Sequence, residues 1–245
     1  LQTGVIDTPR RVRSEIVHEI TLRETSYFLD GLLSDSTRAF LASLAPQSHE
    51  YARLMKAKMR LEHTIAHGGW GASVSSGKYE PGDSGSGVVA LRDRLIAMGY
   101  LHRTVTARYD ASITDAVRVF QEDHGLTVDG VAGGNTLTEI NVTPQERLKS
   151  VIVAMERERW INQPEGLGDR HILVNLTDFN ARIFDHGKLT FETRSVVGHQ
   201  DLDRQTPEFS DVMDHMVINP SWYVPRSIIV GEYLPKLRSN PGAVS

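Results

Sequence analysis

The chain has 245 residues and a mass of 27.3 kDa; 40% of the residues are hydrophobic and 24% are charged. This composition is typical of folded globular proteins and excludes wholesale disorder, and the length favours one to two domains. Lys and Arg total 27 against 31 Asp and Glu, which gives a net charge of −4. That balance argues against a dedicated nucleic-acid-binding protein, because such proteins usually carry a basic domain.

The sequence contains no cysteine, which excludes disulfides, thiolate zinc sites and a cysteine nucleophile within these residues. No apolar run approaches the ~18 residues that a transmembrane helix requires, so we expect no membrane-spanning segment. The chain starts at Leu1 and not at Met. We interpret this start as the mark of a processed or trimmed chain, which leaves room for a removed targeting segment.

Residues 1–70 are predicted to form a helical scaffold region. Apolar residues recur at helical spacing from Glu15 to Leu33 and again from Tyr51 to Ile65. Such stripes are typical of core-facing helices, so we expect no cofactor site here. Residues 71–81 are rich in Gly and Ser and are predicted to be a linker.

Residues 82–142 are predicted to form a compact unit of three short helices. Ser112 and Asp115 have the spacing of a capping box, which predicts the start of the second helix. The pair Asp129-Gly130 indicates a turn, and a short third helix is expected over Thr136 to Ile140.

Residues 143–170 are predicted to be a connecting helix followed by a loop. Thr143 is a suitable cap, Pro144 suits the first helical position and Glu146 completes the capping box. The helix is expected to run to about Trp160, and the loop to span Asn162 to Asp169.

From residue 171 the hydrophobic period changes from helical spacing to alternation, which predicts strands. Asp185-His186-Gly187-Lys188 is typical of a hairpin turn. The predicted strands are His171–Leu176, Ala181–Phe184, Leu189–Val197 and Met213–Ile218. A last helix, Ile228 to Leu237, is expected to break near Pro235. The fold class is therefore α+β multidomain: a helical region, a three-helix bundle, and the start of an antiparallel β domain over residues 171–245 that we expect to be incomplete.

Three patterns suggest chemistry but have simpler structural interpretations. Ser75 and Lys78 match the S-x-x-K spacing of acylating serine enzymes, yet they lie in a Gly/Ser-rich stretch without companion motifs. Gly82, Gly85 and Gly87 precede a helix but form no phosphate-binding loop motif. His199 with Asp201 and Asp203 is more simply a solvated loop, so no metal site is predicted.

Residues 82–142 resemble a peptidoglycan-binding domain of the three-helix type. The resemblance is carried by Gly82-Asp-Ser-Gly85, Val89-Ala-Leu91, Gly99-Tyr-Leu101, Tyr109-Asp110, Phe120-Gln121, His124-Gly-Leu126 and Val128-Asp-Gly-Val131. It implies contact with peptidoglycan glycan or stem peptides, for which Tyr109, Gln121 and Asp129 are the candidate residues. The alternative is a retained scaffold that binds nothing.

Residues 171–245 resemble the opening of a YkuD-type L,D-transpeptidase catalytic domain. The matching segments are Val174-Asn175, Val196-Val-Gly198, Arg204-Gln-Thr-Pro207, Phe209-Ser210 and Asn219-Pro-Ser-Trp222-Tyr-Val-Pro225-Arg-Ser-Ile228. The order of helical region, binding module and this domain is similar to that of the large YcbB-like members of bacterial envelopes.

This resemblance implies a cofactor-free enzyme of peptidoglycan biosynthesis that contributes to cell shape. A cysteine thiolate, activated by histidine, would attack the third residue of a tetrapeptide stem, expel D-alanine and form 3→3 cross-links; carbapenem acylation is also implied. The family's His and Ser-His-Gly-Cys segment follow the Asn-Pro-x-Trp region, and nothing here matches them. His215 precedes that region, so no catalytic residue is assigned and the 245 residues are expected to be inactive alone.

The same resemblance makes Trp222, Tyr223 and Arg226 candidates for the stem-peptide groove. Aromatic rings offer rigid apolar area and Arg can pair with a carboxylate of the acidic stem; the alternative for Trp222 is a buried core position. The expected location is the periplasm or cell envelope, after removal of a signal peptide. The rival hypothesis is a non-catalytic peptidoglycan-binding envelope protein, which the zero cysteine count favours.

Overall fold

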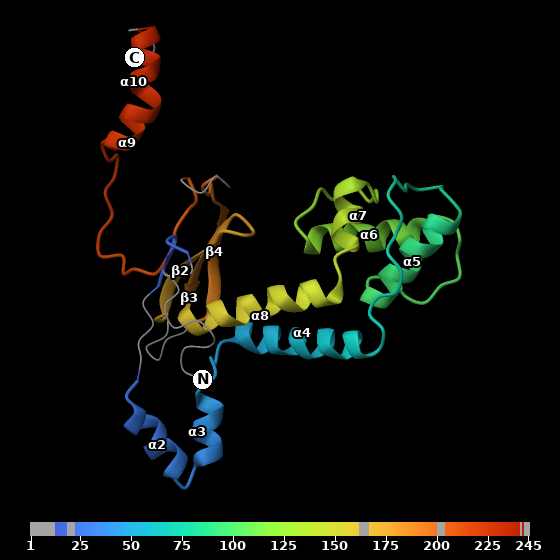
Figure 1. Ribbon diagram of the computed structural model, residues 1–245, viewed down its shortest axis with the longest axis horizontal. Coiled ribbons are helices and arrows are strands. Elements are labelled where there is room, and N and C mark those ends of the chain that lie inside the picture. The colour runs from blue at the N-terminus through green and yellow to red at the C-terminus, as the bar shows by residue number, and fades with distance from the viewer. Residues whose placement is uncertain (1–12, 19–22, 162–166, 200–203, 241, 243–245) are drawn as a thin grey trace. The chain divides into compact units, whose positions relative to one another are not determined.

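The computed structural model describes residues 13–18, 23–161, 167–199, 204–240 and 242 (Figure 1). The chain divides into two units, residues 1–210 and 211–245. Helices dominate the first 161 residues and a three-stranded antiparallel sheet follows them. This arrangement confirms the predicted α+β class.

The N-terminal region is helical only in part. A short strand, β1 (Ile16–Val17), precedes the helices α2 (Thr25–Leu33), α3 (Thr37–Ser43) and α4 (His49–Ala66). The helix predicted to start at Glu15 is therefore wrong in its first part; residues 19–22 lie outside the described residues. Ile16 is buried, and its strand pairs with β5 (Glu208–Phe209). Because this partner is distant in sequence, the residues around Ile16 give no local signal that predicts a strand.

Helix α4 packs antiparallel along α8 (Pro144–Ile161) (Figure 1). The Ser48 hydroxyl donates to the Glu158 carboxylate at 2.8 Å, and Arg159 donates to the hydroxyl of the buried Tyr51. These contacts join the start of α4 to the end of α8. The predicted apolar stripe of α4 thus finds its partner surface in α8.

The predicted start of α8 is confirmed in atomic detail. The Thr143 amide donates to the Glu146 carboxylate at 2.9 Å, and the Glu146 amide donates to the Thr143 hydroxyl at 3.2 Å. This reciprocal pair satisfies two backbone donors that the helix itself leaves without partners. Hydrogen bonds from Thr143 to the carboxylate also hold the pKa of Glu146 below its ordinary value.

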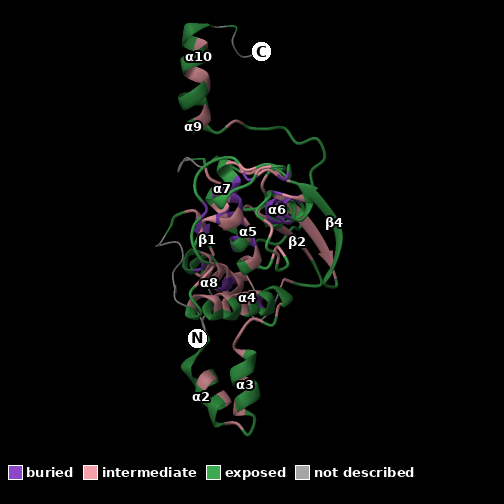
Figure 2. Ribbon diagram, turned by 90° about the vertical axis from the view of Figure 1, so that its right-hand side faces the viewer, coloured by how far each residue is buried: buried purple, intermediate pink, exposed green. Residues whose placement is uncertain are grey.

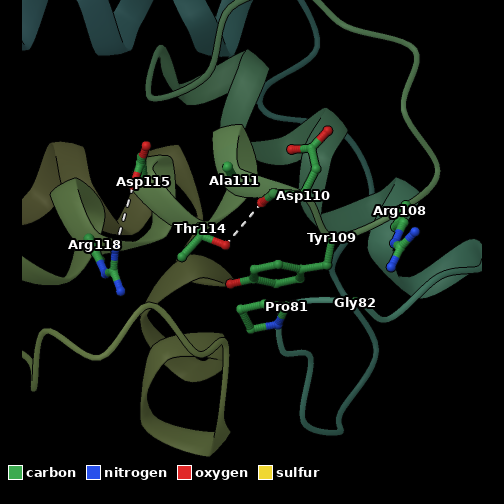
Figure 3. Close-up of a pocket in the computed structure, with 9 residues that line it drawn as sticks. All are labelled: Pro81, Gly82, Arg108, Tyr109, Asp110, Ala111, Thr114, Asp115 and Arg118. Carbon is green, nitrogen blue, oxygen red and sulfur yellow. Dashed lines mark hydrogen bonds and ion pairs between the residues drawn. The ribbon is translucent and has the colours of Figure 1, made fainter.

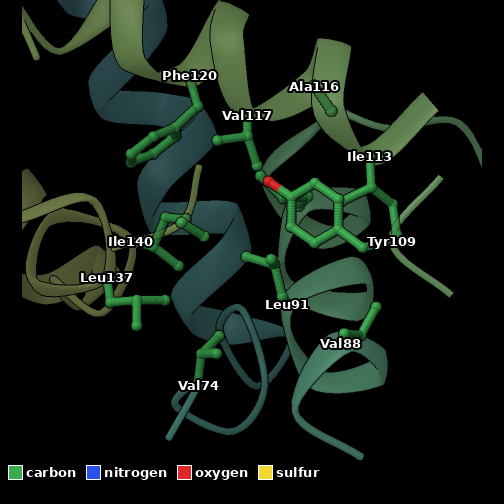
Figure 4. Close-up of a cluster of buried hydrophobic side chains, with 12 residues drawn as sticks. Val74, Val88, Leu91, Tyr109, Ile113, Ala116, Val117, Phe120, Leu137 and Ile140 are labelled. Atoms are coloured by element: carbon green, nitrogen blue, oxygen red, sulfur yellow. The ribbon is translucent and has the colours of Figure 1, made fainter. Parts of the chain in front are cut away.

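Between α4 and α8, the first unit contains the predicted three-helix bundle, which consists of α5 (Ser86–Met98), α6 (Ala111–Asp123) and α7 (Gly134–Ile140). Figure 2 shows buried residues gathered in these helices and between α4 and α8. The core consists of twelve buried hydrophobic side chains (Figure 4): Val74, Val88, Leu91, Leu95, Tyr109, Ile113, Ala116, Val117, Phe120, Ala132, Leu137 and Ile140.

Residues 71–81, predicted as a linker, form neither helix nor an extended strand but contribute to this core. Val74 is 2% exposed, and its amide donates to the Asn141 side chain at 2.9 Å. The Tyr79 backbone exchanges two hydrogen bonds with Ala132, at 3.1 and 2.9 Å. This Gly- and Ser-rich segment therefore packs closely against the helices of the bundle.

The start of α6 differs from the prediction. Its cap is Asp110, whose carboxylate accepts from the Ile113 amide at 3.2 Å and from the Ser112 hydroxyl at 2.6 Å. These hydrogen bonds, the one from Ser112 foremost, lower the pKa of Asp110. The predicted capping box at Ser112 and Asp115 is wrong, because Ser112 bonds to Asp110 and Asp115 lies 3.6 Å from Arg118.

The β region contains β2 (Arg170–Asn175), β3 (Asn180–Asp185) and β4 (Lys188–Arg194), paired antiparallel in that order. The hairpin between β3 and β4 turns at His186 and Gly187, whose φ angles are 49° and 74°. Positive φ at both central residues is the feature of a type I′ turn, which matches strand twist. The predicted hairpin is therefore confirmed.

The second unit lacks the strand predicted over Met213–Ile218, which is an exposed segment without strand pairing. A β-branched, apolar run forms a strand only where a neighbouring strand can accept its hydrogen bonds. The C-terminal helical run comprises α9 (Arg226–Ile228), a π-helical turn η1 (Ile229–Tyr233) and α10 (Leu234–Ser239). Pro235 lies in the first turn of α10, where its missing N–H is tolerated.

None of the helices in the described part of the chain combines the length and apolar character that spanning a bilayer requires.

Candidate functional site

An open hollow lies at the N-terminal end of α6 in the three-helix unit (Figure 3). Two chain segments hold its shape: the Gly82 amide donates to the Tyr109 carbonyl at 2.9 Å, and the Tyr109 amide donates to the Asp83 carbonyl at 2.7 Å. The hollow has a volume of about 500 Å³, within the range of small-ligand sites. It is lined by Pro81, Gly82, Arg108, Tyr109, Asp110, Ala111, Thr114, Asp115 and Arg118.

Tyr109 forms the base of the hollow. It is only 1% exposed, and its hydroxyl donates to the Gly130 carbonyl at 2.8 Å. Burial raises the pKa of Tyr109 above its ordinary value of 10.0, so the phenol stays neutral. A ligand would therefore meet the edge of a fixed ring, while the hydroxyl serves the fold.

Charges of both signs surround this ring. Arg108 and Asp110 precede the helix, while Asp115 and Arg118 follow on its first two turns, 3.6 Å apart. Asp115 and Arg118 are more than half exposed, so their ion pair is weak and can be exchanged for ligand contacts. The hollow can thus offer hydrogen bonds and charge to a ligand that carries amides and carboxylates.

The side chain of Gln121 organises the turn beside the hollow. Its amide nitrogen lies within hydrogen-bond distance of the Asp129 carboxylate (2.8 Å), the Val131 carbonyl (3.0 Å) and the Thr136 hydroxyl (3.1 Å). Its oxygen accepts from the amides of Asp129 and Gly130, at 3.1 and 2.9 Å. Hydrogen bonds from the Val131 amide and Gln121 lower the pKa of Asp129.

The turn that Gln121 holds passes close to two side chains in the wall of the hollow. Gly130 has a φ of 74°, and a Cβ at this position would lie 2.9 Å from the Thr114 side chain and 3.0 Å from that of Arg118. Glycine meets both requirements, since it adopts positive φ without strain and leaves room for the neighbours. Gln121 therefore supports Thr114 and Arg118 through Gly130.

The three residues that the sequence predicted as ligand contacts in this module occupy three different positions in the structure. Tyr109 lies in the hollow, Gln121 is buried behind it, and Asp129 is exposed on the turn. Sequence reasoning missed Arg108, Thr114 and Arg118. Helical spacing could have indicated them. If Asp110 is taken as the cap of the helix, positions 111, 114, 115 and 118 lie on one helix face.

Trp222, Tyr223 and Arg226 lie in the second unit, and all three are exposed. Trp222 is 67% and Tyr223 88% exposed, and Arg226 is the first residue of α9. The alternative of a buried core position for Trp222 is therefore wrong for this structure. All three side chains are therefore accessible to a ligand.

The Ser75 and Lys78 pair shows no arrangement for acylation chemistry. The Ser75 hydroxyl shares a 2.7 Å hydrogen bond with the Tyr79 hydroxyl, while the Lys78 ammonium pairs with Glu80 at 2.5 Å. The hydrogen bond with Glu80 raises the pKa of Lys78, which disfavours the neutral amine that a general base requires.

Of the predicted cation candidates, Asp201 and Asp203 lie outside the described residues. Among the residues that are described, no three His, Asp or Glu side chains come together in an arrangement that could hold a metal ion.

Two family models match separate parts of the chain. Residues 84–140 match the "Putative peptidoglycan binding domain", and seven of the nine residues that line the hollow lie in this segment. Residues 169–245 match the "L,D-transpeptidase catalytic domain" named YkuD. Residues 84–140 are therefore similar to a peptidoglycan-binding domain, and residues 169–245 are similar to a YkuD-type L,D-transpeptidase domain.

One curated relative carries the name of the same enzyme class in its description. A protein of Haemophilus influenzae named "Putative L,D-transpeptidase" is 30% identical over 74 residues. The matched segment covers 30% of this chain and 15% of the relative.

Proposed function

We propose that the protein is an L,D-transpeptidase of the large YcbB-like kind, which cross-links peptidoglycan stem peptides in the bacterial envelope, on the periplasmic side. The match of residues 169–245 to the catalytic-domain family carries this proposal. A helical scaffold and a binding module precede that domain in the chain, which supports the larger architecture.

The proposed reaction is acyl transfer through a cysteine that residues outside the 245 would supply. The thiolate attacks the carbonyl of the third stem residue, the bond to the terminal D-alanine breaks, and D-alanine leaves with a proton on its amine. An amine of a neighbouring stem then attacks the thioester, so that a 3→3 amide forms and the thiol is regenerated. A thiolate suits both steps, being a strong nucleophile and a good leaving group.

Within the described residues, Trp222, Tyr223 and Arg226 are proposed to contact the stem peptide. Their exposure supports this role. The rings offer rigid apolar area, and the guanidinium can hold a stem carboxylate by two parallel hydrogen bonds. A carbapenem would acylate the same thiol.

The test uses the product of the complete gene, incubated with disaccharide tetrapeptides and analysed by mass spectrometry. We expect release of D-alanine and a dimer joined through the third residues, both abolished when thiols are alkylated beforehand. The 245-residue chain is the matched control and is expected to give neither product, because it contains no thiol. Product formation that survives alkylation would contradict the cysteine mechanism.

The peptidoglycan-binding module supports a second candidate function, binding without catalysis. The observation that favours it is the hollow at Tyr109, most of whose lining residues lie in the segment that matches the binding-domain family. We propose that this hollow holds a stem peptide or its glycan attachment. Tyr109 would supply the base, with Gln121 and Asp129 fixing the neighbouring turn.

Filling the hollow tests this site. Ala111 is exposed in the lining, so Ala111→Trp should block ligand entry without changing charge and weaken binding to isolated sacculi about tenfold, a loss of ~1.4 kcal/mol. Ala42→Trp, on the exposed face of α3, is the matched control and should bind like wild type. Equal binding of both variants would show that the ligand lies elsewhere.

A further inference from the structure

The exposed face of α4 carries a row of basic side chains, Arg53, Lys56 and Arg60, which we call the basic row. Spacings of three and four residues place them on one side of the helix, along about 10 Å of its length at 1.5 Å per residue. All three are exposed and, with Met59, line an open hollow of about 460 Å³.

The basic row is not required by the packing of α4. Helix α8 lies along α4 (Figure 1). Tyr51, which is buried on the side of α4 opposite the row, accepts a hydrogen bond from Arg159 of α8. Within the described part of the chain, neither Lys56 nor Arg60 has a carboxylate at ion-pair distance, whereas Arg53 pairs with Glu50 at 2.5 Å. Both members of that pair are largely exposed, so a ligand carboxylate can replace Glu50 at little cost.

The character of this face favours a hydrated anionic chain over a bilayer. A helix that lies in a membrane interface needs a free apolar face, and in α4 that face is covered by α8. Met59, 62% exposed, is the one large apolar side chain among the four that line the hollow. Exposed guanidinium and ammonium groups instead form charge-assisted hydrogen bonds with carboxylates, and Arg can form two parallel ones.

We propose that the basic row binds the free carboxylates of peptidoglycan stem peptides and forms a second contact with the wall, separate from the hollow at Tyr109. The proposal rests on peptidoglycan being the partner of this chain. Stem peptides are acidic, so they complement the row in charge. The contact lies in the helical scaffold region, outside the segments that match the two family models.

The test measures binding of the 245-residue chain to isolated sacculi over a range of salt concentrations. The triple variant Arg53→Gln/Lys56→Gln/Arg60→Gln is expected to bind about fivefold more weakly at low salt, with a shallower salt dependence. The control Arg38→Gln/Lys149→Gln/Lys188→Gln removes the same charge from exposed positions elsewhere and should bind like wild type. Arg53→Lys/Arg60→Lys, which conserves charge, should also retain binding.

Sacculi whose carboxylates have been converted to amides separate the possible outcomes. On these sacculi we expect wild type and the triple variant to bind equally. If wild type and the triple variant bind native sacculi equally while Ala111→Trp binds weakly, the proposed role of the basic row is wrong and the proposed peptidoglycan binding stands. Failure of wild type to bind at any salt would overturn both. Row-dependent binding to phosphatidylglycerol vesicles, with equal binding of the two proteins to sacculi, would assign the row to a membrane instead.

Discussion

Replacing Arg94 by Met is expected to lower the free energy of unfolding of the three-helix domain by about 3 kcal/mol. Arg94 lies on α5 and is only 3% exposed. Burial lowers its pKa, but a guanidinium remains charged at neutral pH. Methionine has a similar length and helix propensity, so the change removes the hydrogen bonds and leaves α5 itself intact.

The expected loss of stability is large because the guanidinium donates hydrogen bonds to four backbone carbonyls in two chain segments. It donates to Gly71 and Ala72 at 3.2 and 3.4 Å, and to Ile140 and Val142 at 2.7 and 3.2 Å. Residues 71–72 lead into the domain and 140–142 lead out of it. Without Arg94, partly buried carbonyls face an apolar side chain, and each loses a charge-assisted partner.

Urea denaturation with hydrogen exchange of residues 84–140 measures this effect. The control Arg103→Met replaces an exposed arginine in the loop after α5 and should change stability by less than ~0.5 kcal/mol. Comparable losses in both variants would show that the carbonyl contacts of Arg94 do not stabilise the domain.

Replacing Gln121 by Leu is also expected to cost about 3 kcal/mol. The side chains are similar in size, but Leu leaves the amides of Asp129 and Gly130 without the acceptor that Gln121 provides. The cost of an unsatisfied buried donor, and not a cavity, therefore dominates. Gly130 lies so close to Thr114 and Arg118 that an added Cβ would come within 2.9 and 3.0 Å of their side chains. A shift of this turn would disturb the wall of the hollow, so we also expect weaker binding to sacculi.

Hydrogen exchange resolves this effect residue by residue. The amides of Asp129 and Gly130 should exchange faster in Gln121→Leu, whereas those of α5 should change only through global stability. Gln145→Leu, at an exposed position in the first turn of α8, is the matched control. Unchanged exchange at Asp129 and Gly130 would contradict the assigned role of Gln121.

Local signals predicted much of the fold. The sequence predicted the helices α5, α7 and α8, and the capping box at Thr143 and Glu146 gave the start of α8. The hairpin at His186-Gly187 followed from turn chemistry that requires positive φ. Each of these signals lies within a few residues of the feature it specifies.

Predictions failed where the deciding partner is distant. The β1–β5 pairing joins Ile16 to Glu208, and the Arg157 guanidinium contacts Glu208 through two hydrogen bonds of 3.0 and 2.9 Å. Residues 213–218 have the composition of a strand but no strand partner in the described part of the chain. Sheet formation depends on pairing, which a single segment does not encode.

The sequence by itself determined the α+β class, the helices of the three-helix unit and the family resemblance on which the proposed function rests, because periodicity, caps and motifs are short-range properties of a chain. Only the tertiary structure decided that Arg94 is buried, that Gln121 acts behind the hollow, and that Tyr109 lies at its base. The physical reason is desolvation: a polar side chain can be buried only where distant backbone groups complete its hydrogen bonds. Those partners are brought together by folding alone.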